Sequence, residues 1–333
     1  MKGRSVHAPR SLLDATNTVS VGNAQEVAAA ADCILANCFG VGSFDRELIR
    51  AGFTVVDRLF AGDCPGYLAC DMPYHDLRHS LDAALVMARL IAGYQSKQCG
   101  SPDALTPEYG LLGVLLALLH DTGFIRKTSE IAFCGPQLTA EHESRSVEFA
   151  ESYLRTTSVA RYAALAPLIF ATRLRADLSQ LFAGLERPAI TIGQMLGSAD
   201  LLSQMADRDY PERCYYHLYP ELVLGGGDRA RTPDGQEQVL YRDAFDLLSK
   251  TPSFYENIVS RRLNQDFQGV PRHLAAHFAG ADPYAGAIQR NIDRCAHIVA
   301  EGHGRLLRGE PITTTLDLAP IYHGRQPAPP PVH

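Results

Sequence analysis

Two histidines and an aspartate recur at helical spacing in the segment Tyr74–Asp82. His75, His79 and Asp82 occupy positions i, i+4 and i+7, which lie on one face of an α-helix. Apolar residues between Leu81 and Ile91 would lie on roughly the opposite face. Because polar groups that leave water need partners, the imidazole face must meet one, and the pattern favours a metal ion.

Two later apolar segments carry further side chains of the metal-binding type. The run 110–119 is followed directly by His120 and Asp121, and Asp200 lies within the apolar segment 190–205. Neutral imidazoles combined with carboxylates suit zinc, iron or manganese. The predicted metal ligands are therefore His79, His120, Asp121 and Asp200.

The neighbours of these ligands indicate what such a site would do. Asp121 follows a histidine directly, so its carboxylate can bridge to a second ion. Two ions roughly 3.5–4 Å apart activate a bridging hydroxide and hold a phosphoryl group. His75 lies one turn before His79 and outside the ligand set, a placement that suits a general acid for a leaving oxygen. Asp82 or a nearby carbonyl group is expected to orient the His79 imidazole through a hydrogen bond.

Helices must position these side chains, and the sequence carries several helix signals. Alternating apolar and polar runs are scarce, so few or no strands are expected and the predicted fold class is all-α. The predicted helices are 24–38 capped by Asn23, 44–51 capped by Ser43 and closed by Gly52, 74–94, 107–119 capped by Thr106, 140–154 capped by Thr139, 158–174 interrupted at Pro167, 190–205, 240–250, 253–263 and 284–300.

The chain divides into three predicted parts. Residues 1–22 read as a loose arm, residues 23–305 as a single helical domain with its motif core at 74–205, and residues 306–333 as a proline-rich tail. The net charge of −6 gives no reason to expect a nucleic-acid polymer as partner. The longest apolar run is far shorter than the roughly 20 residues that span a bilayer. Eight cysteines without a CxxC pair, and no apolar leader, favour the cytoplasm and no membrane.

The motifs resemble those of the HD superfamily of metal-dependent phosphohydrolases, and most closely those of the class I 3′,5′-cyclic nucleotide phosphodiesterases. Residues 74–82, YHDLRHSLD, are similar to the signature YHNxxHxxDV of that family. His120–Asp121 resembles its HD pair, and residues 198–201 resemble the segment with its last ligand. The resemblance implies an HD-domain, phosphodiesterase-like helical bundle. It also implies His75 and Asp121 as catalytic residues, zinc (or iron or manganese) in a tight site, and magnesium or manganese in a second one.

Other positions match the family less closely. Glu141 fits an acidic residue that supports the metal-bound waters, and His142 resembles a histidine that binds a second ion in other HD proteins. Phe124 stands where the family usually has a histidine, and Arg173 replaces the aspartate of an Ala-Thr-Asp segment. The glutamine that grips purines has no clear counterpart. The resulting substrate-binding candidates are Tyr74, Arg173, Gln265 and Gln268.

The predicted function is hydrolysis of a cyclic nucleotide or a similar small phosphodiester, through attack by a metal-bound hydroxide. The first alternative is a nucleotide phosphomonoesterase, and the second is a di-iron oxygenase, because myo-inositol oxygenase shares the HD fold. A third is a ligand-binding HD module without catalysis. The expected partner is a small phosphoester, and a homodimer is possible.

Overall fold

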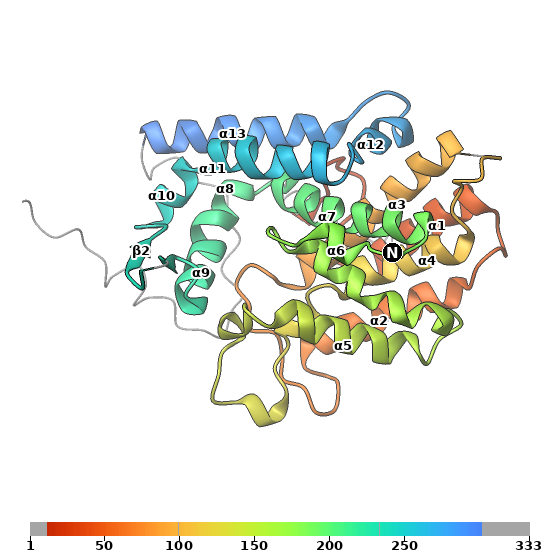
Figure 1. Ribbon diagram of the computed structural model, residues 1–333, viewed down its shortest axis with the longest axis horizontal. Coiled ribbons are helices and arrows are strands. Elements are labelled where there is room, and N and C mark those ends of the chain that lie inside the picture. The colour runs from red at the N-terminus through yellow and green to blue at the C-terminus, as the bar shows by residue number, and fades with distance from the viewer. Residues whose placement is uncertain (1–11, 99, 233, 302–333) are drawn as a thin grey trace, which may run out of the picture.

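The computed structural model describes residues 12–98, 100–232 and 234–301, and these are mostly helical (Figure 1). The α-helices are α1 (Ala24–Phe39), α2 (Arg46–Ala61), α3 (Leu77–Gln98), α4 (Pro107–Leu119), α5 (His142–Leu154), α6 (Leu178–Leu181), α7 (Arg187–Ala206), α8 (Tyr210–Arg213), α9 (Tyr219–Gly225), α10 (Ala244–Ser249), α11 (Thr251–Phe254), α12 (Arg272–His277) and α13 (Pro283–Glu301). The 3₁₀ segments are Thr122–Phe124, Thr128–Glu130, Gly135–Leu138 and Ala160–Thr172, and the π-helical segments are Cys214–Leu218, Tyr255–Val259 and Arg262–Asp266. The prediction of an all-α chain is confirmed.

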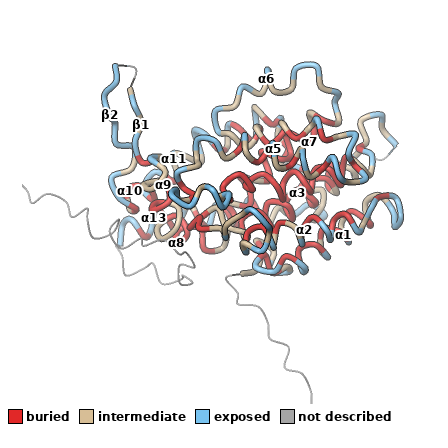
Figure 2. Tube along the Cα trace, turned by 90° about the horizontal axis from the view of Figure 1, so that it is seen from below, coloured by how far each residue is buried: buried red, intermediate tan, exposed pale blue. Residues whose placement is uncertain are grey.

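The only strands among the described residues form a short hairpin. β1 (Arg229–Arg231) and β2 (Glu237–Val239) pair antiparallel, with Arg229 opposite Val239. Figure 2 shows this hairpin standing away from the helical body with most of its surface exposed, whereas buried residues concentrate along α3.

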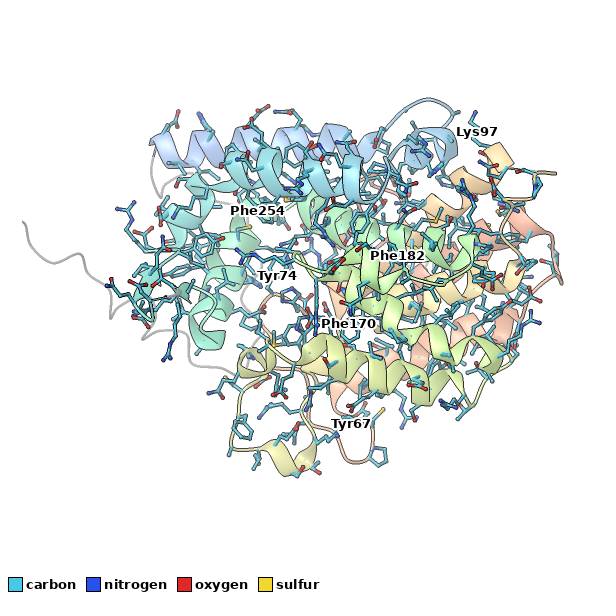
Figure 3. The ribbon with its side chains drawn as sticks, in the orientation of Figure 1. Tyr67, Tyr74, Lys97, Phe170, Phe182 and Phe254 are labelled. Carbon is cyan, nitrogen blue, oxygen red and sulfur yellow. The ribbon has the colours of Figure 1, made fainter. Side chains whose placement is uncertain are left out.

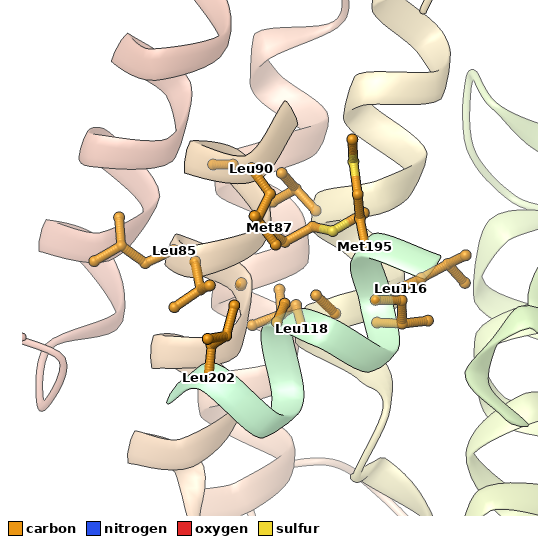
Figure 4. Packing of buried hydrophobic residues seen from close by; sticks show 14 of the residues in the cluster. Leu85, Met87, Leu90, Leu116, Leu118, Met195 and Leu202 are labelled. Atoms are coloured by element: carbon orange, nitrogen blue, oxygen red, sulfur yellow. The ribbon is translucent and has the colours of Figure 1, made fainter. Parts of the chain in front are cut away.

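Three helices, α3, α4 and α7, form the centre of the core (Figure 4). α4 is apolar all round, and its residues from Tyr109 to Leu119 are buried, as its sequence predicts. Each leucine of this kind contributes roughly 1.5–3 kcal/mol through burial. The side chains that interlock at this point include Leu85, Met87 and Leu90 from α3, Leu116 and Leu118 from α4, and Met195 and Leu202 from α7.

The N-terminal caps of α1 and α4 are those that the sequence predicts. The Asn23 side chain accepts hydrogen bonds from the backbone N–H groups of Gln25 and Glu26. The Thr106 hydroxyl accepts one from the N–H of Tyr109, with Pro107 at the first helical position.

The prediction for α2 is wrong at both ends. Its cap is Asp45, and the helix continues through Gly52 to Ala61. Gly52 is buried inside the helix, where a Cβ atom would lie 2.7 Å from Leu115 Cδ2, so the glycine permits close packing of α2 on α4. Gly62, in the left-handed conformation, ends the helix instead.

Two helices that carry the motifs begin later than predicted. α3 begins at Leu77 because Asp76 Oδ1 accepts a hydrogen bond from the His79 N–H, so His75 precedes the helix. α5 begins at His142, and the Thr139 hydroxyl donates to the Pro136 carbonyl instead of capping the helix. The predicted helix 158–174 is largely a 3₁₀ segment, since Pro167 lacks the N–H that an α-helix needs.

Residues 12–22 lie against the helices, although the sequence predicts a loose arm there. Asp14 is 1% exposed and accepts a hydrogen bond from Arg89 Nη1 at 2.7 Å, and Leu13 pairs with Ser20. Residues 1–11 and the predicted tail 306–333 lie outside the described residues. Within the described ranges, no helix combines the length and the apolar character that crossing a bilayer requires.

Candidate metal centre

His79 is fixed by the start of α3. The Asp76 cap places His79 in the first helical turn, where its side chain is buried. Arg213 Nη1 lies 3.1 Å from Asp76 Oδ2 and holds this cap in place. The signature that this segment resembles has asparagine at the position of Asp76. Aspartate and asparagine cap helices about equally well, so Asp76 can cap α3 as an asparagine would.

His120 and Asp121 lie at the end of α4. The imidazole of His120 donates from Nδ1 to the Ala117 carbonyl at 2.7 Å, which leaves Nε2 as the atom that can bind a metal. His120 and Asp121 are each about 2% exposed. α7 brings Asp200 to the same place, with its side chain 16% exposed.

The predicted ligand atoms come together in two overlapping groups, one of His79, His120 and Asp200 and the other of His75, His79 and Asp121. His79 Nε2 lies 3.1 Å from Asp200 Oδ1 and 3.6 Å from Asp121 Oδ2, and His120 Nε2 lies 3.2 Å from Asp121 Oδ2 and 3.7 Å from Asp200 Oδ1. Ligands at about 2.0–2.2 Å from an ion, at the angles of octahedral or tetrahedral coordination, are roughly 2.8–3.6 Å apart. These residues could therefore hold a metal ion.

The hydrogen-bonding pattern supports this fit. His120 Nε2 and Asp121 Oδ2 are both buried and have no hydrogen-bond partner among the described residues. Burial alone would raise the pKa of Asp121 and Asp200, but the surrounding histidines outweigh it and hold both values far below the usual range. Two buried carboxylates need positive charge beside them, which the histidines or a bound ion would supply.

His75 lies beside this group and is held by a residue that sequence reasoning missed. Its Nδ1 contacts Glu221 Oε1 of α9, and Glu221 Oε2 also accepts the backbone N–H of Tyr74 at 2.8 Å. Burial lowers the pKa of His75, but Glu221, Asp121 and the other carboxylates outweigh it and raise the pKa to about 9. Glu221 is separated from His75 by 146 positions, so no local sequence signal could have identified it.

Helix α5 supplies a fourth histidine and a different acid from the predicted one. His142 donates from Nδ1 to the Thr139 carbonyl, and its Nε2 lies 3.9 Å from Asp121 Oδ1. Glu141 is exposed just before the helix, so its assignment beside the metal waters is not supported. Glu143, two residues further along the chain, is buried, and its Oε2 lies 3.3 Å from His142 Nδ1.

Phe124, at the position where the resembled family has a histidine, packs against two histidines of this site. Its ring stacks on His142 with centroids 4.1 Å apart and on His75 with centroids 5.1 Å apart. Phe124 therefore fixes the planes of the two histidines that flank the four-ligand group.

Asp82 does not contact His79 in the described structure. Its Oδ1 is buried without a hydrogen-bond partner, and burial together with Asp207 and Asp14 raises the pKa of its carboxyl to about 8. The charged groups that act on Asp82 are Asp207, Asp14, Arg89 and Arg78, so the predicted orienting role beside His79 is not supported.

A cavity of about 970 Å³ opens from the candidate metal centre. It is lined by His75, His120, Asp121 and Asp200, and also by the predicted substrate residue Arg173. Tyr74 is buried below it under the Arg213 guanidinium, and Figure 3 shows Tyr74 in the interior between Phe254 and Phe170.

Two of the predicted substrate residues are misplaced. Gln265 and Gln268 are exposed and are not among the described residues that line the cavity. Gln265 belongs to the π-helical segment Arg262–Asp266, whose buried residues are Arg262 and Leu263, and Gln268 lies in the turn that follows it.

The sequence was also compared with models of known protein families and with curated proteins. The chain matches no model of a known protein family, and no curated protein is similar to it.

Proposed function

We propose that this chain is a metal-dependent phosphohydrolase of the HD type. Within that class we propose a phosphodiesterase that acts on a small phosphodiester such as a cyclic nucleotide. One observation carries the proposal. The four predicted ligands come from the start of α3, the residues just after α4, and α7, and their nitrogen and oxygen atoms approach one another at 3.1–3.7 Å, with a carboxylate-held histidine beside them and a large cavity in front.

A metal bound by His79, His120, Asp121 and Asp200 would act as a Lewis acid and lower the pKa of a water molecule that it holds. The chain supports that chemistry by orienting the ligands: Ala117 fixes the tautomer of His120, and Asp76 fixes the turn that carries His79. Zinc, iron and manganese all suit this donor set.

We assign to His75 the role of general acid, which donates a proton to the leaving oxygen. Glu221 occupies its Nδ1, which leaves Nε2 for the cavity that His75 lines. A carboxylate behind the ring favours the imidazolium, and the Nε2 proton is then delivered to the ester oxygen as it departs. His75 is a catalytic residue in this scheme, and Glu221 is its positioning residue.

A second ion, magnesium or manganese, is proposed on the other side of Asp121. Asp121 Oδ2 faces His79 and His120, whereas Oδ1 faces His142 Nε2 at 3.9 Å. One carboxylate with its two oxygens turned toward different histidines suits a bridge between two ions.

Turnover of bis(4-nitrophenyl) phosphate, cyclic nucleotides and nucleoside monophosphates, each with added zinc, manganese or magnesium and without oxygen, tests the proposal. Hydrolysis of a phosphodiester is expected under these anaerobic conditions. Activity on monoesters alone would replace the phosphodiesterase by a phosphomonoesterase. A requirement for dioxygen and ferrous iron would replace it by an oxygenase, for which His142→Ala should abolish turnover entirely. Binding without turnover would leave only a ligand-binding module.

A further inference from the structure

The cavity is much larger than the phosphoryl group that the metal centre would hold. Its 970 Å³ lies at the upper end of the range for small-molecule sites, about 300–1,000 Å³. The part of the chain after residue 210 supplies one wall of it. Most of that wall is apolar, namely Leu218, Leu222, Tyr241, Leu247 and Phe254, and Lys250 and Thr251 also belong to it. The site therefore suits a substrate with a substantial organic group, and Figure 3 labels Phe254 of this wall.

Three cations also line the cavity, and two of them already have acidic partners. Arg173 Nε lies 3.3 Å from Glu143 Oε1, and Lys250 Nζ lies 2.9 Å from Asp246 Oδ2. Within the described ranges, Arg175 makes no hydrogen bond and no ion pair. Apart from the two ligand aspartates, Glu143 is the only described carboxylate that lines the cavity, so no lining acid remains for Arg175.

The backbone around Arg175 is held in place. Arg262 donates from Nη1 to the Leu174 carbonyl at 3.1 Å and from Nη2 to the Ala171 carbonyl at 3.0 Å. On the other side, Asp177 caps α6. Arg175 thus projects from a turn that is anchored at both ends, which reduces the entropy that binding would cost.

We infer that the substrate carries a second anionic group, a phosphate or carboxylate, which Arg175 receives while the metal centre holds the scissile phosphoester. The inference rests on the proposed function for the identity of the first group. An organic part between the two anions would lie along the apolar wall. Arginine is suited to the task because its planar guanidinium can donate two parallel hydrogen bonds to either anion.

A matched pair of substrates tests this inference. 4-Nitrophenyl phenyl phosphate and 4-nitrophenyl 4-carboxyphenyl phosphate share the same scissile bond and leaving group but differ by one negative charge. The metal-loaded wild type should have the higher kcat/KM for the carboxylated ester. Arg175→Gln should reduce that preference by roughly threefold to tenfold, the range of a partly exposed charge-assisted contact. The control is Arg261→Gln, which removes an exposed arginine outside the cavity and should keep the preference.

Calorimetric binding of phenyl phosphate and 4-carboxyphenyl phosphate gives a second readout that needs no turnover. The affinity ratio should favour the carboxylated ligand and should fall in Arg175→Gln alone. Equal ratios in Arg175→Gln and the wild type, or no preference in the wild type, would overturn the inference. Absence of hydrolysis with the calorimetric preference intact would remove the proposed function and leave the second-anion site standing.

Discussion

The imidazole of His75 has one nitrogen against Glu221 and the other free for the cavity. Replacing it by alanine removes the proposed proton donor but none of the four ligands. For an alkyl ester, His75→Ala should therefore lose about 10²–10⁴-fold in kcat, the usual contribution of general-acid catalysis. The loss should be much smaller for a 4-nitrophenyl ester, whose leaving oxygen needs no proton.

Metal content separates the catalytic role of His75 from a ligand role. His75 also lies close enough to His79 and Asp121 to share an ion with them. The proposed role requires that His75→Ala keeps its metal at the wild-type level. Equal losses on good and poor leaving groups, or a chain that purifies without metal, would count against it.

Each site residue could be predicted only where a local sequence pattern marks it. His79, His120, Asp121 and Asp200 each stand in an apolar helix whose pattern is visible locally, and the structure brings all four together. Glu221 contributes only through the tertiary fold. The choice between Glu141 and Glu143 depended on a shift of two residues in the start of α5, which begins at His142 and not at residue 140.

At the scale of elements, the contact between the 3₁₀ segment Thr122–Phe124 and the start of α5 holds the backbone of His142 in place. Gly123 donates its N–H to Ser146 Oγ at 2.8 Å, and a Cβ atom on it would lie 1.9 Å from the His142 carbonyl oxygen. That oxygen belongs to the backbone and cannot move aside cheaply. Gly123→Ala should therefore cost roughly 1–3 kcal/mol in the free energy of unfolding, as overpacking of a core does.

Gly286→Ala in α13 is the matched control for this substitution. Its Cβ would meet only the flexible end of Arg290, at 3.2 Å. Alanine inside a helix is favoured over glycine by roughly 0.5–1 kcal/mol, so this variant should be as stable as the wild type or more so. Urea denaturation checks both, and a Gly123→Ala midpoint equal to that of the wild type would refute the close contact.

The same scale shows why some helices could be predicted and others could not. α1 and α4 carry a capping residue and a continuous apolar pattern, which are local signals. Gly52 looks like a helix end in the sequence, but tertiary packing against Leu115 overrides that signal. The π-helical turns after residue 213 and the hairpin β1–β2 depend on contacts that periodicity does not encode.

At the scale of the whole molecule, the buried side chain of His273 should make the free energy of unfolding depend on pH. Its side chain is buried with its ring against Tyr94, and burial, together with Arg272, lowers its pKa to about 4. An unfolded histidine takes up a proton near pH 6.5, so between about pH 6.5 and 4 the unfolded state binds the extra proton. The contribution of His273 is thus present above that range and lost as the pH falls through it.

Denaturation of His273→Gln at pH 7 and pH 5 measures this effect. The variant should lose less stability between the two pH values than the wild type does. The control is His297→Gln, which alters an exposed histidine of α13 and should keep the wild-type pH dependence. A His273→Gln chain that is as sensitive to acid as the wild type would contradict the assignment.

The central claim concerns the ion that joins α3, α4 and α7. Elemental analysis of the purified wild type, His79→Ala, Asp200→Ala and the exposed control Glu141→Gln measures it directly. The account predicts bound transition metal in the wild type and in Glu141→Gln, together with its loss and a lower melting temperature in the two ligand variants. Asp200→Ala with the full metal content of the wild type would contradict it.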